Sequence, residues 1–338
     1  MTTHPSRGRQ PGTARRLVTG TLLGATLLMA VVAGPVEAAP SVKTRIKGDV
    51  LNIIGSAAAD VIVLRLAVED PTVLEVDANG NGSADFSIPR ARFDRIEVAG
   101  AGGADTITID ESNGAFSHDH PTALDGGAGN DVLTAGSGPQ VIFGGVGNDT
   151  IDGGPGADAI DAGPGDDTIT WKPGSYSDYV WGGLGFDTIA FTGGSVDEQL
   201  AIAHVGAIVR ITRNVDSVAM HLEDVERLDL ATLGGADTVT VDDLAGAGVT
   251  EVAIELALAS AGDGAPDTVT VNGSPSDDVV SVAAVGGGVA IARSGTATVR
   301  LHGAEPALDT LVVNGLAGDD QIDILAGVEA LIQVVSNP

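Results

Sequence analysis

Aspartate recurs at a fixed place between residues 126 and 190, and this spacing could carry chemistry. The segment divides into seven frames of nine residues, with an insert at Trp171 and Lys172, and six frames place Asp at their sixth position. Ionised carboxylates are the ligands that hard cations such as Ca²⁺ prefer. The segment has no His or Cys, so it lacks the nitrogen and sulfur ligands of zinc sites. The recurring carboxylates therefore favour a site for an oxygen-ligated cation.

The net charge points the same way. The 338 residues include 17 basic and 46 acidic residues, and without the first 38 residues the chain has 13 and 45, a formal charge of −32. This charge makes nucleic acid and anionic lipid surfaces poor partners. Acidic disordered chains are poor in hydrophobic residues, whereas 43% of this chain is hydrophobic. The chain can therefore build a core if its carboxylates are neutralised, which suggests a bound cation.

The seven frames share the pattern G-G-x-G-x-D-x-U-x, in which U is aliphatic. They read GGAGNDVLT, AGSGPQVIF, GGVGNDTID, GGPGADAID, AGPGDDTIT, PGSYSDYVW and GGLGFDTIA. One frame alone would be weak evidence, but seven nearly contiguous frames are a specific signal. The segment resembles the calcium-binding nonapeptide repeats of the RTX, or hemolysin-type, family of secreted bacterial proteins. Relaxed copies begin at Gly55, Gly100, Thr232, Gly262, Gly273 and Gly315.

The resemblance implies an all-β fold, a parallel β-roll or β-helix solenoid with less regular β flanks. In such a roll six residues of each frame form a turn, three form a strand, and two frames make one coil. Alternate frames would then stack, with Asp131, Asp149, Asp167 and Asp187 on one edge. The other edge would hold Asp158 and Asp178, with Gln140 in place of its first Asp. The residues expected to point inward are Leu133, Ile142, Ile151, Ile160, Ile169, Val180 and Ile189.

Stacking would place successive carboxylates about 4.8 Å apart. At that distance they repel by roughly 3 kcal/mol at an effective dielectric constant near 20. Calcium would relieve this repulsion, because it accepts carboxylate and carbonyl oxygens in a flexible geometry, whereas magnesium requires a tighter octahedron. The alternative is a metal-free solenoid in which Gly-Asp turns only separate the strands. The predicted metal-site residues are Gly126, Gly127, Gly129, Asp131, Gly144, Gly145, Gly147, Asp149, Gly153, Gly154, Gly156, Asp158, Gly163, Gly165, Asp167, Asp178, Gly182, Gly183, Gly185 and Asp187.

A second candidate for metal binding lies upstream of the repeats. Asp77, Asn79, Asn81 and Asp85 follow the order of the first nine positions of an EF-hand-type loop, D-x-N-x-N-G. The twelfth position is Ile88 instead of the usual Glu. An Asn-Gly hairpin turn between two strands explains the same residues equally well.

Residues 1–38 have the pattern of a signal peptide. Arginines at positions 7, 9, 15 and 16 precede an apolar stretch at 17–34, and small residues favour cleavage after Ala38. A membrane anchor is the alternative, because about 18 apolar residues can just span a bilayer. Three further regions are predicted: an N-terminal β-rich repeat-like region at 39–125, the RTX-like calcium-binding β-roll at 126–190, and a C-terminal β-rich repeat-like region at 191–338.

The sequence gives little support for catalysis. It contains no nucleophile elbow, Walker loop or HExxH motif, and no Arg lies in residues 126–190. We therefore expect a secreted, extracellular calcium-binding protein with a structural, envelope or adhesion role, and not an enzyme. Its expected partners are calcium ions, with an extracellular polysaccharide or surface as a further candidate. The alternative is a calcium-dependent extracellular carbohydrate-active enzyme or its accessory module.

Overall fold

The structure, a computed structural model, describes residues 41–258 and 261–338. The predicted signal peptide, residues 1–38, lies outside the described residues. The described residues belong to one compact unit. The described part consists of β-strands and three short 3-10 turns, η1 (Arg90–Arg92), η2 (Val215–Ser217) and η3 (Val328–Ala330). It contains no helix long and apolar enough to cross a membrane. The predicted all-β fold is confirmed.

Two sheets of fourteen strands each make up most of this unit. Sheet A contains, in spatial order, β1 (Lys43–Lys47), β2 (Val50–Ile54), β6 (Arg95–Gly102), β8 (Thr122–Ala128), β10 (Val141–Val146), β12 (Ala159–Pro164), β14 (Tyr179–Leu184), β18 (Val218–Glu223), β17 (Ile208–Arg213), β16 (Gln199–Val205), β20 (Thr238–Val241), β24 (Thr268–Asn272), β28 (Thr310–Asn314) and β30 (Gln333–Asn337). Sheet B contains β29 (Gln321–Ile324), β25 (Val279–Val285), β26 (Gly288–Arg293), β27 (Thr298–His302), β21 (Glu251–Glu255), β19 (Arg227–Ala231), β15 (Thr188–Thr192), β13 (Thr168–Trp171), β11 (Thr150–Asp152), β9 (Val132–Thr134), β7 (Thr106–Asp110), β3 (Val61–Leu66), β4 (Val73–Asp77) and β5 (Phe86–Pro89). A small pair, β22 (Ala257–Leu258) and β23 (Ala261–Gly262), forms a third sheet.

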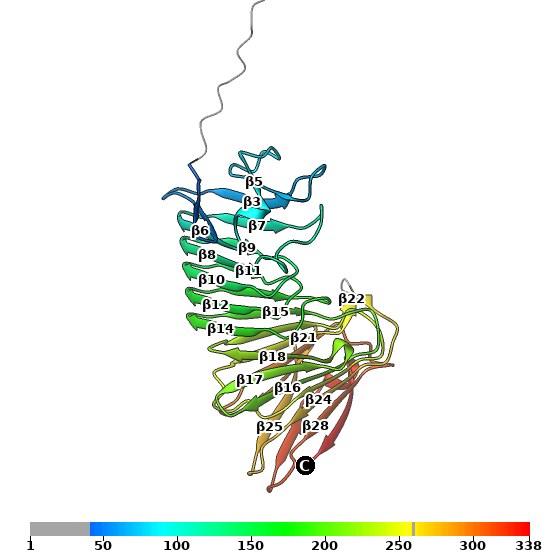
Figure 1. Cartoon of the computed structure of the whole chain (residues 1–338). Helices are drawn as coiled ribbons and strands as arrows, with labels where there is room; N and C mark the ends of the chain where they lie inside the picture. Colours follow the sequence, from blue (N-terminus) through cyan, green and yellow to red (C-terminus); the bar gives the residue numbers. More distant parts are fainter. Residues whose placement is uncertain (1–40, 259–260) are drawn as a thin grey trace, which may run out of the picture. The chain divides into compact units, whose positions relative to one another are not determined.

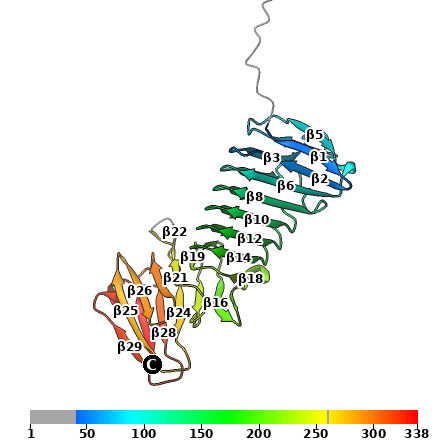
Figure 2. The ribbon, with the colours of Figure 1, turned by 90° about the vertical axis from the view of Figure 1, so that its left-hand side faces the viewer.

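The chain alternates between the two sheets from β8 to β15, so each coil adds one strand to each sheet. All these neighbours are parallel, and equivalent residues of the frames lie side by side: Ile142 pairs with Leu124 and Ile160, and Ile151 with Leu133 and Ile169. Figures 1 and 2 show the resulting stack of short strands in green. The predicted β-roll of two frames per coil is therefore present.

The narrow space between the sheets is filled by the aliphatic residue at the eighth position of each frame. These seven side chains are at most 1% exposed, as the alternation of polar and apolar residues predicted. Two aromatic rings also pack in this core: Trp171 at the end of β13 and Phe191 on the neighbouring β15 stack with their centroids 4.3 Å apart.

Antiparallel segments interrupt the parallel stacking outside the regular frames. The strands β16, β17 and β18 form such a segment in sheet A, and β25, β26 and β27 form one in sheet B. Residues 199–213 form a hairpin of two strands, β16 and β17, with Gly206 at its turn. These insertions lengthen the interval between successive parallel strands, which hides the repeat in the sequence.

Two segments with nearly the same sequence pattern occupy opposite sheets. Residues 93–110 run from β6 in sheet A to β7 in sheet B, whereas residues 225–242 run from β19 in sheet B to β20 in sheet A. Both run from one strand through a glycine turn with Asp into a second strand. The pattern therefore specifies a turn that joins the two sheets, but it does not specify which sheet the chain leaves and which it enters.

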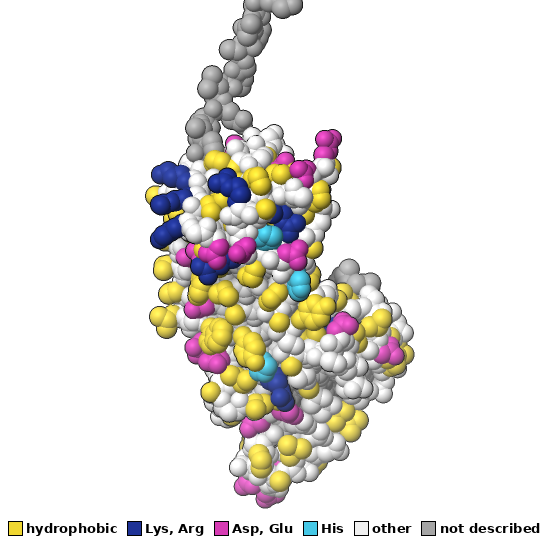
Figure 3. All heavy atoms as spheres, viewed as in Figure 1, with side chains coloured by type: hydrophobic (Ala, Val, Ile, Leu, Met, Phe, Trp, Pro, Cys, Tyr) yellow, Lys and Arg dark blue, Asp and Glu magenta, His cyan; other side chains and the backbone are white. Residues whose placement is uncertain are grey.

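The surface of sheet A carries exposed aromatic side chains in the region of the regular frames. Phe143, Tyr179 and Trp181 are 44%, 52% and 38% exposed, and Tyr179 stacks against His221 of the neighbouring strand at 4.5 Å. On the face drawn in Figure 3, hydrophobic side chains gather over the central strands, while Lys and Arg gather over the N-terminal coils. The two kinds of surface are thus separated along the stack.

Candidate metal centre

A ladder of aspartates runs along the start of the sheet B strands. Asp131, Asp149, Asp167 and Asp187 each stand one residue before their strand and are at most 1% exposed. The backbone N–H of Asp131 donates to Oδ1 of Asp149 (2.7 Å), that of Asp149 to Asp167 (2.7 Å), and that of Asp167 to Asp187 (2.9 Å). The predicted stacking of these four residues on one edge is confirmed.

This first ladder is longer than the sequence analysis predicted. The N–H of Asp60 donates to Oδ1 of Asp105, and the N–H of Asp105 donates to Oδ1 of Asp131, both at 2.7 Å. At the other end the N–H of Asp187 donates to Glu226 Oε2 (2.8 Å). The relaxed repeat copies upstream of the roll contain Asp60 and Asp105, so a signal for them existed. Glu226 stands in no repeat copy, and nothing in the sequence pattern indicated it.

A second, shorter ladder runs along the start of the sheet A strands. The N–H of Gln140 donates to Oδ1 of Asp158 (2.7 Å), and the N–H of Asp158 donates to Oδ1 of Asp178 (2.9 Å). Gln140 takes the place of the first Asp, as predicted, and its own side-chain amide is buried without a hydrogen-bond partner. The second edge therefore has two carboxylates where the first edge has a continuous row.

In six ladder residues the second carboxylate oxygen has no partner within the described structure, whereas Asp60 Oδ2 accepts from the N–H of Ser56 (2.6 Å). The unpartnered oxygen is buried and accepts no hydrogen bond in Asp105, Asp131, Asp149, Asp158, Asp167 and Asp187. These oxygens lie against the first glycine of the frame: a Cβ added to Gly126 would be 2.5 Å from Asp131 Oδ2, and one added to Gly182 would be 2.8 Å from Asp187 Oδ2. Because an unpaired buried carboxylate oxygen is costly, each of these atoms calls for a cation or a proton.

Peptide oxygens line the same gaps between stacked turns. A Cβ at Gly129 would collide with the carbonyl oxygen of Gly103, and a Cβ at Gly147 would collide with that of Gly129. These two carbonyls face the next coil, whereas the carbonyl oxygen of Gly144 faces the preceding coil, at Gly126. Both glycines at the fourth position, Gly129 and Gly147, have positive φ, 140° and 133°, which favours glycine. The repeated glycines thus keep the turns close enough for oxygens of two turns to face one gap.

From Asp105 to Asp187, burial raises the pKa of the ladder aspartates, and neighbouring carboxylates raise it further, whereas hydrogen bonds from Ser41 and Ser56 outweigh burial and lower the pKa of Asp60. The pKa of Asp149, Asp167 and Asp187 rises to about 6, that of Asp178 to about 7 and that of Asp158 to about 8. The hydrogen bond from the neighbouring backbone N–H lowers each pKa but does not offset burial. In the absence of a metal, these groups therefore retain protons up to mildly acidic or neutral pH, and a cation must displace them.

The donor set fits calcium. No three Asp, Glu, His or Cys side chains converge on a metal position within residues 41–258 and 261–338, so any site must combine carboxylates with peptide carbonyls. Calcium accepts six to eight oxygens of both kinds, including backbone carbonyls, at roughly 2.3–2.6 Å. The unpartnered Oδ2 atoms and the carbonyls of the glycine turns are such oxygens. In the first ladder, Asp131, Asp149, Asp167 and Asp187 would hold the ions between successive turns.

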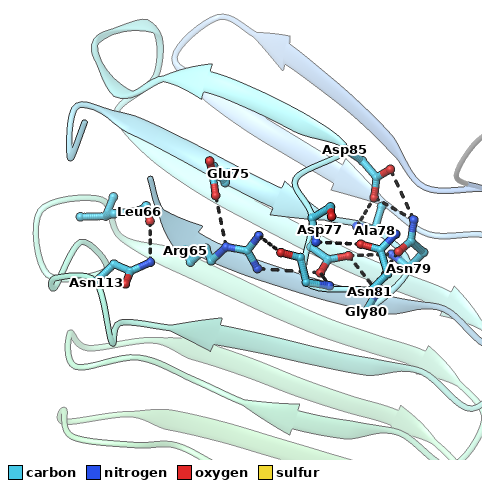
Figure 4. A network of polar contacts seen from close by, with 12 residues as sticks. Arg65, Leu66, Glu75, Asp77, Ala78, Asn79, Gly80, Asn81, Asp85 and Asn113 are labelled. Carbon is cyan, nitrogen blue, oxygen red and sulfur yellow. Dashed lines mark hydrogen bonds and ion pairs between the residues drawn. The ribbon is translucent and has the colours of Figure 1, made fainter. Parts of the chain in front are cut away.

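The loop between β4 and β5 uses its carboxylates differently (Figure 4). Asp77 Oδ1 accepts from the N–H of Gly80 (2.8 Å) and Oδ2 from that of Gly82 (2.7 Å), while Asp85 Oδ2 accepts from the N–H of Ala78 (2.8 Å). Arg65 Nη1 lies 3.8 Å from Asp77 Oδ2. The positive charge of this arginine opposes the binding of a cation beside Asp77.

The two asparagines of the same loop also bind within it. Asn79 Nδ2 donates to Asp85 Oδ2 (3.2 Å), Asn79 Oδ1 accepts from the N–H of Asn81 (3.1 Å), and Asn81 Oδ1 accepts from the N–H of Ser83 (2.7 Å). Because β4 and β5 pair antiparallel, the segment is a hairpin loop capped by its own side chains. Of the two interpretations that the sequence allowed, the geometry favours the hairpin turn.

Comparison with protein families agrees with the position of the two ladders. The family model of the RTX calcium-binding nonapeptide repeat matches four copies, at residues 123–138, 134–169 and 174–190. A comparison with curated proteins found no match. The matched residues include both ladders from Asp131 to Asp187 but not their extensions to Asp60, Asp105 and Glu226. Residues 123–190 are therefore a β-roll of RTX calcium-binding nonapeptide repeats.

Proposed function

We propose that this protein is an exported structural and binding module whose roll becomes fully ordered when calcium enters the gaps between its turns. The observation that carries the proposal is the row of buried Oδ2 atoms in the first ladder that lack any partner. In water these oxygens would be solvated, and in the fold they need a cation or a proton. An extracellular medium rich in calcium supplies the cation.

Export is part of the proposal and depends on the N-terminal sequence. Arginines followed by an apolar stretch and small residues are the pattern of a cleaved signal peptide. RTX repeats are suited to such a route, because a roll that needs calcium stays incompletely ordered where calcium is scarce. Folding and arrival in the extracellular medium would then be coupled.

An adhesion or envelope role is supported by the outer face of sheet A. Phe143 on β10, and Tyr179 and Trp181 on β14, are exposed there, with β12 between the two strands. Exposed aromatic groups on a rigid surface are typical of binding faces. In this proposal the calcium-filled roll holds that face in shape, and the protein performs no catalysis.

The test is a calcium titration of the chain from residue 39 onward, followed by circular dichroism and thermal melting. We expect calcium to increase the β-signal and the melting temperature, with half-saturation at roughly 10⁻⁴–10⁻³ M, the range of extracellular calcium modules. Magnesium at the same concentration serves as the control and should have a much smaller effect. Unchanged spectra and melting temperatures after chelation with EGTA would show the proposal to be wrong.

A further inference from the structure

A third acidic ladder lies outside the segment that matches the RTX repeat. Glu198, Asp237, Asp267 and Asp309 each stand one residue before a strand of sheet A, namely β16, β20, β24 and β28. The N–H of Glu198 donates to Asp237 Oδ1 (2.8 Å), that of Asp237 to Asp267 Oδ1 (2.8 Å), and that of Asp267 to Asp309 Oδ1 (2.9 Å). All four residues are at most 2% exposed. Their bonding repeats that of the first ladder.

The start of this third ladder has its own cation. Arg213, on β17, donates from Nε to Glu198 Oε1 (2.9 Å) and contacts the same oxygen through Nη2. The side chain of Arg213 is 2% exposed, and its guanidinium carbon lies 5.6 Å from the ring centroid of Trp171. A Cβ at Gly193 would be 2.6 Å from Glu198 Oε2, so the acidic group sits against a glycine as in the roll. The arginine therefore occupies the place of a neutralising ion at this rung.

The following rungs have no cation of their own, although Asp309 Oδ2 accepts a hydrogen bond from the N–H of Glu305 (2.6 Å). Asp237 Oδ2 and Asp267 Oδ2 are buried and accept no hydrogen bond, and in residues 41–258 and 261–338 no ion pair reaches Asp237, Asp267 or Asp309. Acidic groups surround them instead. Asp263 Oδ2 accepts from the N–H of Gly235 (3.0 Å), and Glu305 Oε2 accepts from that of Gly264 (2.7 Å). The negative charge of these turns is thus uncompensated.

The electrostatics of the two middle rungs agree with this geometry. Burial, together with the carboxylates of Asp263 and the adjacent rungs, raises the pKa of Asp237 to about 6 and that of Asp267 to about 7. Ionised, these groups would repel each other across one strand spacing, as in the roll. A divalent cation in the gap removes the repulsion and provides a partner for each unpartnered oxygen.

We propose that calcium also binds in the third ladder, in the gap between Asp237 and Asp267 and in the gap between Asp267 and Asp309. Carboxylates of two successive rungs supply its charged ligands, and the peptide and side-chain oxygens of the turns complete the oxygen shell. One column of acids then holds a guanidinium at its first rung and metal ions at the next. The proposal uses the same chemistry as the proposed function but different residues.

A fourth ladder provides an internal control. The N–H of Asp278 donates to Asp320 Oδ1 (2.8 Å) on the sheet B side. Arg293, on β26, donates from Nη1 to Asp278 Oδ1 (2.6 Å) and also pairs with Asp243. Arg293 follows Asp278 by 15 residues, as Arg213 follows Glu198. Asp320 Oδ2 is also buried without a hydrogen-bond partner, but the facing rung, Asp278, is paired with Arg293. This gap therefore has one uncompensated carboxylate instead of two, and we expect no calcium there.

The experiment counts calcium ions bound to the chain from residue 39 onward, by equilibrium dialysis at saturating calcium. Asp267→Asn changes the rung shared by both proposed gaps and should reduce the number of bound ions by about two. Asp320→Asn, the control in the arginine-containing ladder, should leave the number unchanged. A variant Asp267→Asn that binds as many ions as the native chain would overturn the proposal, and the rungs would then hold protons instead.

A measurement on the native chain guards against a variant that fails to fold. Hydrogen exchange with and without calcium should show added protection in β20 and β24, at residues 238–241 and 268–272, and little change in β29. If calcium protects only residues 123–190, the third ladder is not a calcium site although the proposed function stands. If the native chain binds no calcium at all, both the proposed function and this inference fail.

Discussion

The roll at residues 123–190 and the coils that follow it stack the same acidic ladder at different intervals. Successive rungs of the first ladder are 18 residues apart between Asp131 and Asp149, whereas Glu198 and Asp237 are 39 apart. The longer interval contains a hairpin, and that hairpin supplies Arg213. A short repeat thus leaves its charge to an ion from the medium, while a longer one has room for a cation of its own. The difference separates a region that depends on the medium from one that is partly self-sufficient.

The arginine-containing rungs therefore provide a starting point for folding without metal. Arg213 and Arg293 are part of the chain and are therefore present at any calcium concentration. Each pairs with the acidic residue that stands directly before its own hairpin, Glu198 or Asp278. Solenoid stability comes largely from contacts between neighbouring coils. Coils that are neutralised internally can then serve as a template on which the roll orders when calcium arrives.

The largest expected effect comes from a charge placed in the thin core of the roll. Ile151→Asp buries a carboxylate without a partner, and we expect a loss on the order of 4 kcal/mol or more in the free energy of unfolding. The loss should spread to adjacent frames but leave β20 and β24 protected in hydrogen exchange. Asp152→Asn, beside it, is the control. That group is partly exposed and paired with Lys172, so its loss should stay below about 1 kcal/mol. Similar losses in both variants would contradict the assigned alternation.

The second prediction concerns the cation built into the chain. Arg213→Met leaves Glu198 buried without its partner, which should cost about 3–5 kcal/mol. The loss should be present in calcium and in EGTA alike, because no metal takes part in this pair. Arg210→Met, an exposed position on the same strand, should change stability by no more than about 0.5 kcal/mol. Chemical denaturation of both variants measures the difference, and equal losses would refute the role given to Arg213.

The two ladders of the roll should differ in calcium affinity. Asp149→Ala removes a rung from the middle of a continuous acidic row and should lower the affinity roughly tenfold, equivalent to about 1.4 kcal/mol. Asp178→Ala acts on a ladder already broken at Gln140 and should cost less. Isothermal titration calorimetry of the two variants gives the order. The reverse order would mean that continuity of the row does not determine binding.

The fourth prediction is a dependence of metal-free stability on pH. The pKa of Asp149, Asp167 and Asp187 is raised from 3.8 to about 6, so the folded state binds these protons more tightly than the unfolded chain does. Stability without metal should therefore be greatest below pH 3.8 and fall as the pH rises to about 6. Calcium binds the ionised form, so its stabilising effect should grow over the same interval. Thermal melts in EGTA and in calcium at several pH values test this, and a metal-free melting temperature that rises with pH would contradict it.

The regular part of the fold could be predicted because its chemistry repeats locally. Six Asp residues in seven frames specify the stacking, and the aliphatic eighth position specifies the core. Asp60, Asp105, Asp237 and Asp267 stand at the sixth position of relaxed copies, so the sequence indicated them individually but not the columns they form. The rungs at Asp237, Asp267 and Asp309 are separated by 30 and 42 residues, since inserted segments remove any fixed period. Only the topology brings them into one column.

Pairings across inserted hairpins could not be predicted from the sequence for the same reason. Nothing in the spacing of Glu198 and Arg213 distinguishes them from a solvated acid and base, and their burial follows from the turn of β16 into β17. The Asp77 loop shows the opposite error. Its residue order is that of a calcium loop, but Arg65 on the neighbouring strand and the backbone of the loop itself satisfy the carboxylates. Residue types define what a site could bind, while neighbours from elsewhere in the chain determine whether it remains free to do so.

The placement of one sequence pattern in both sheets has a consequence for how the chain could have grown. Residues 93–110 turn from sheet A to sheet B and residues 225–242 turn from B to A, so either sheet accepts the same corner. Gain or loss of a single nonapeptide would move every later strand to the opposite sheet, yet each inward aliphatic would still face the core. Duplication events need not preserve an even number of units. The length of such a protein can therefore drift in steps of nine residues, and the number of ions it holds can drift with it.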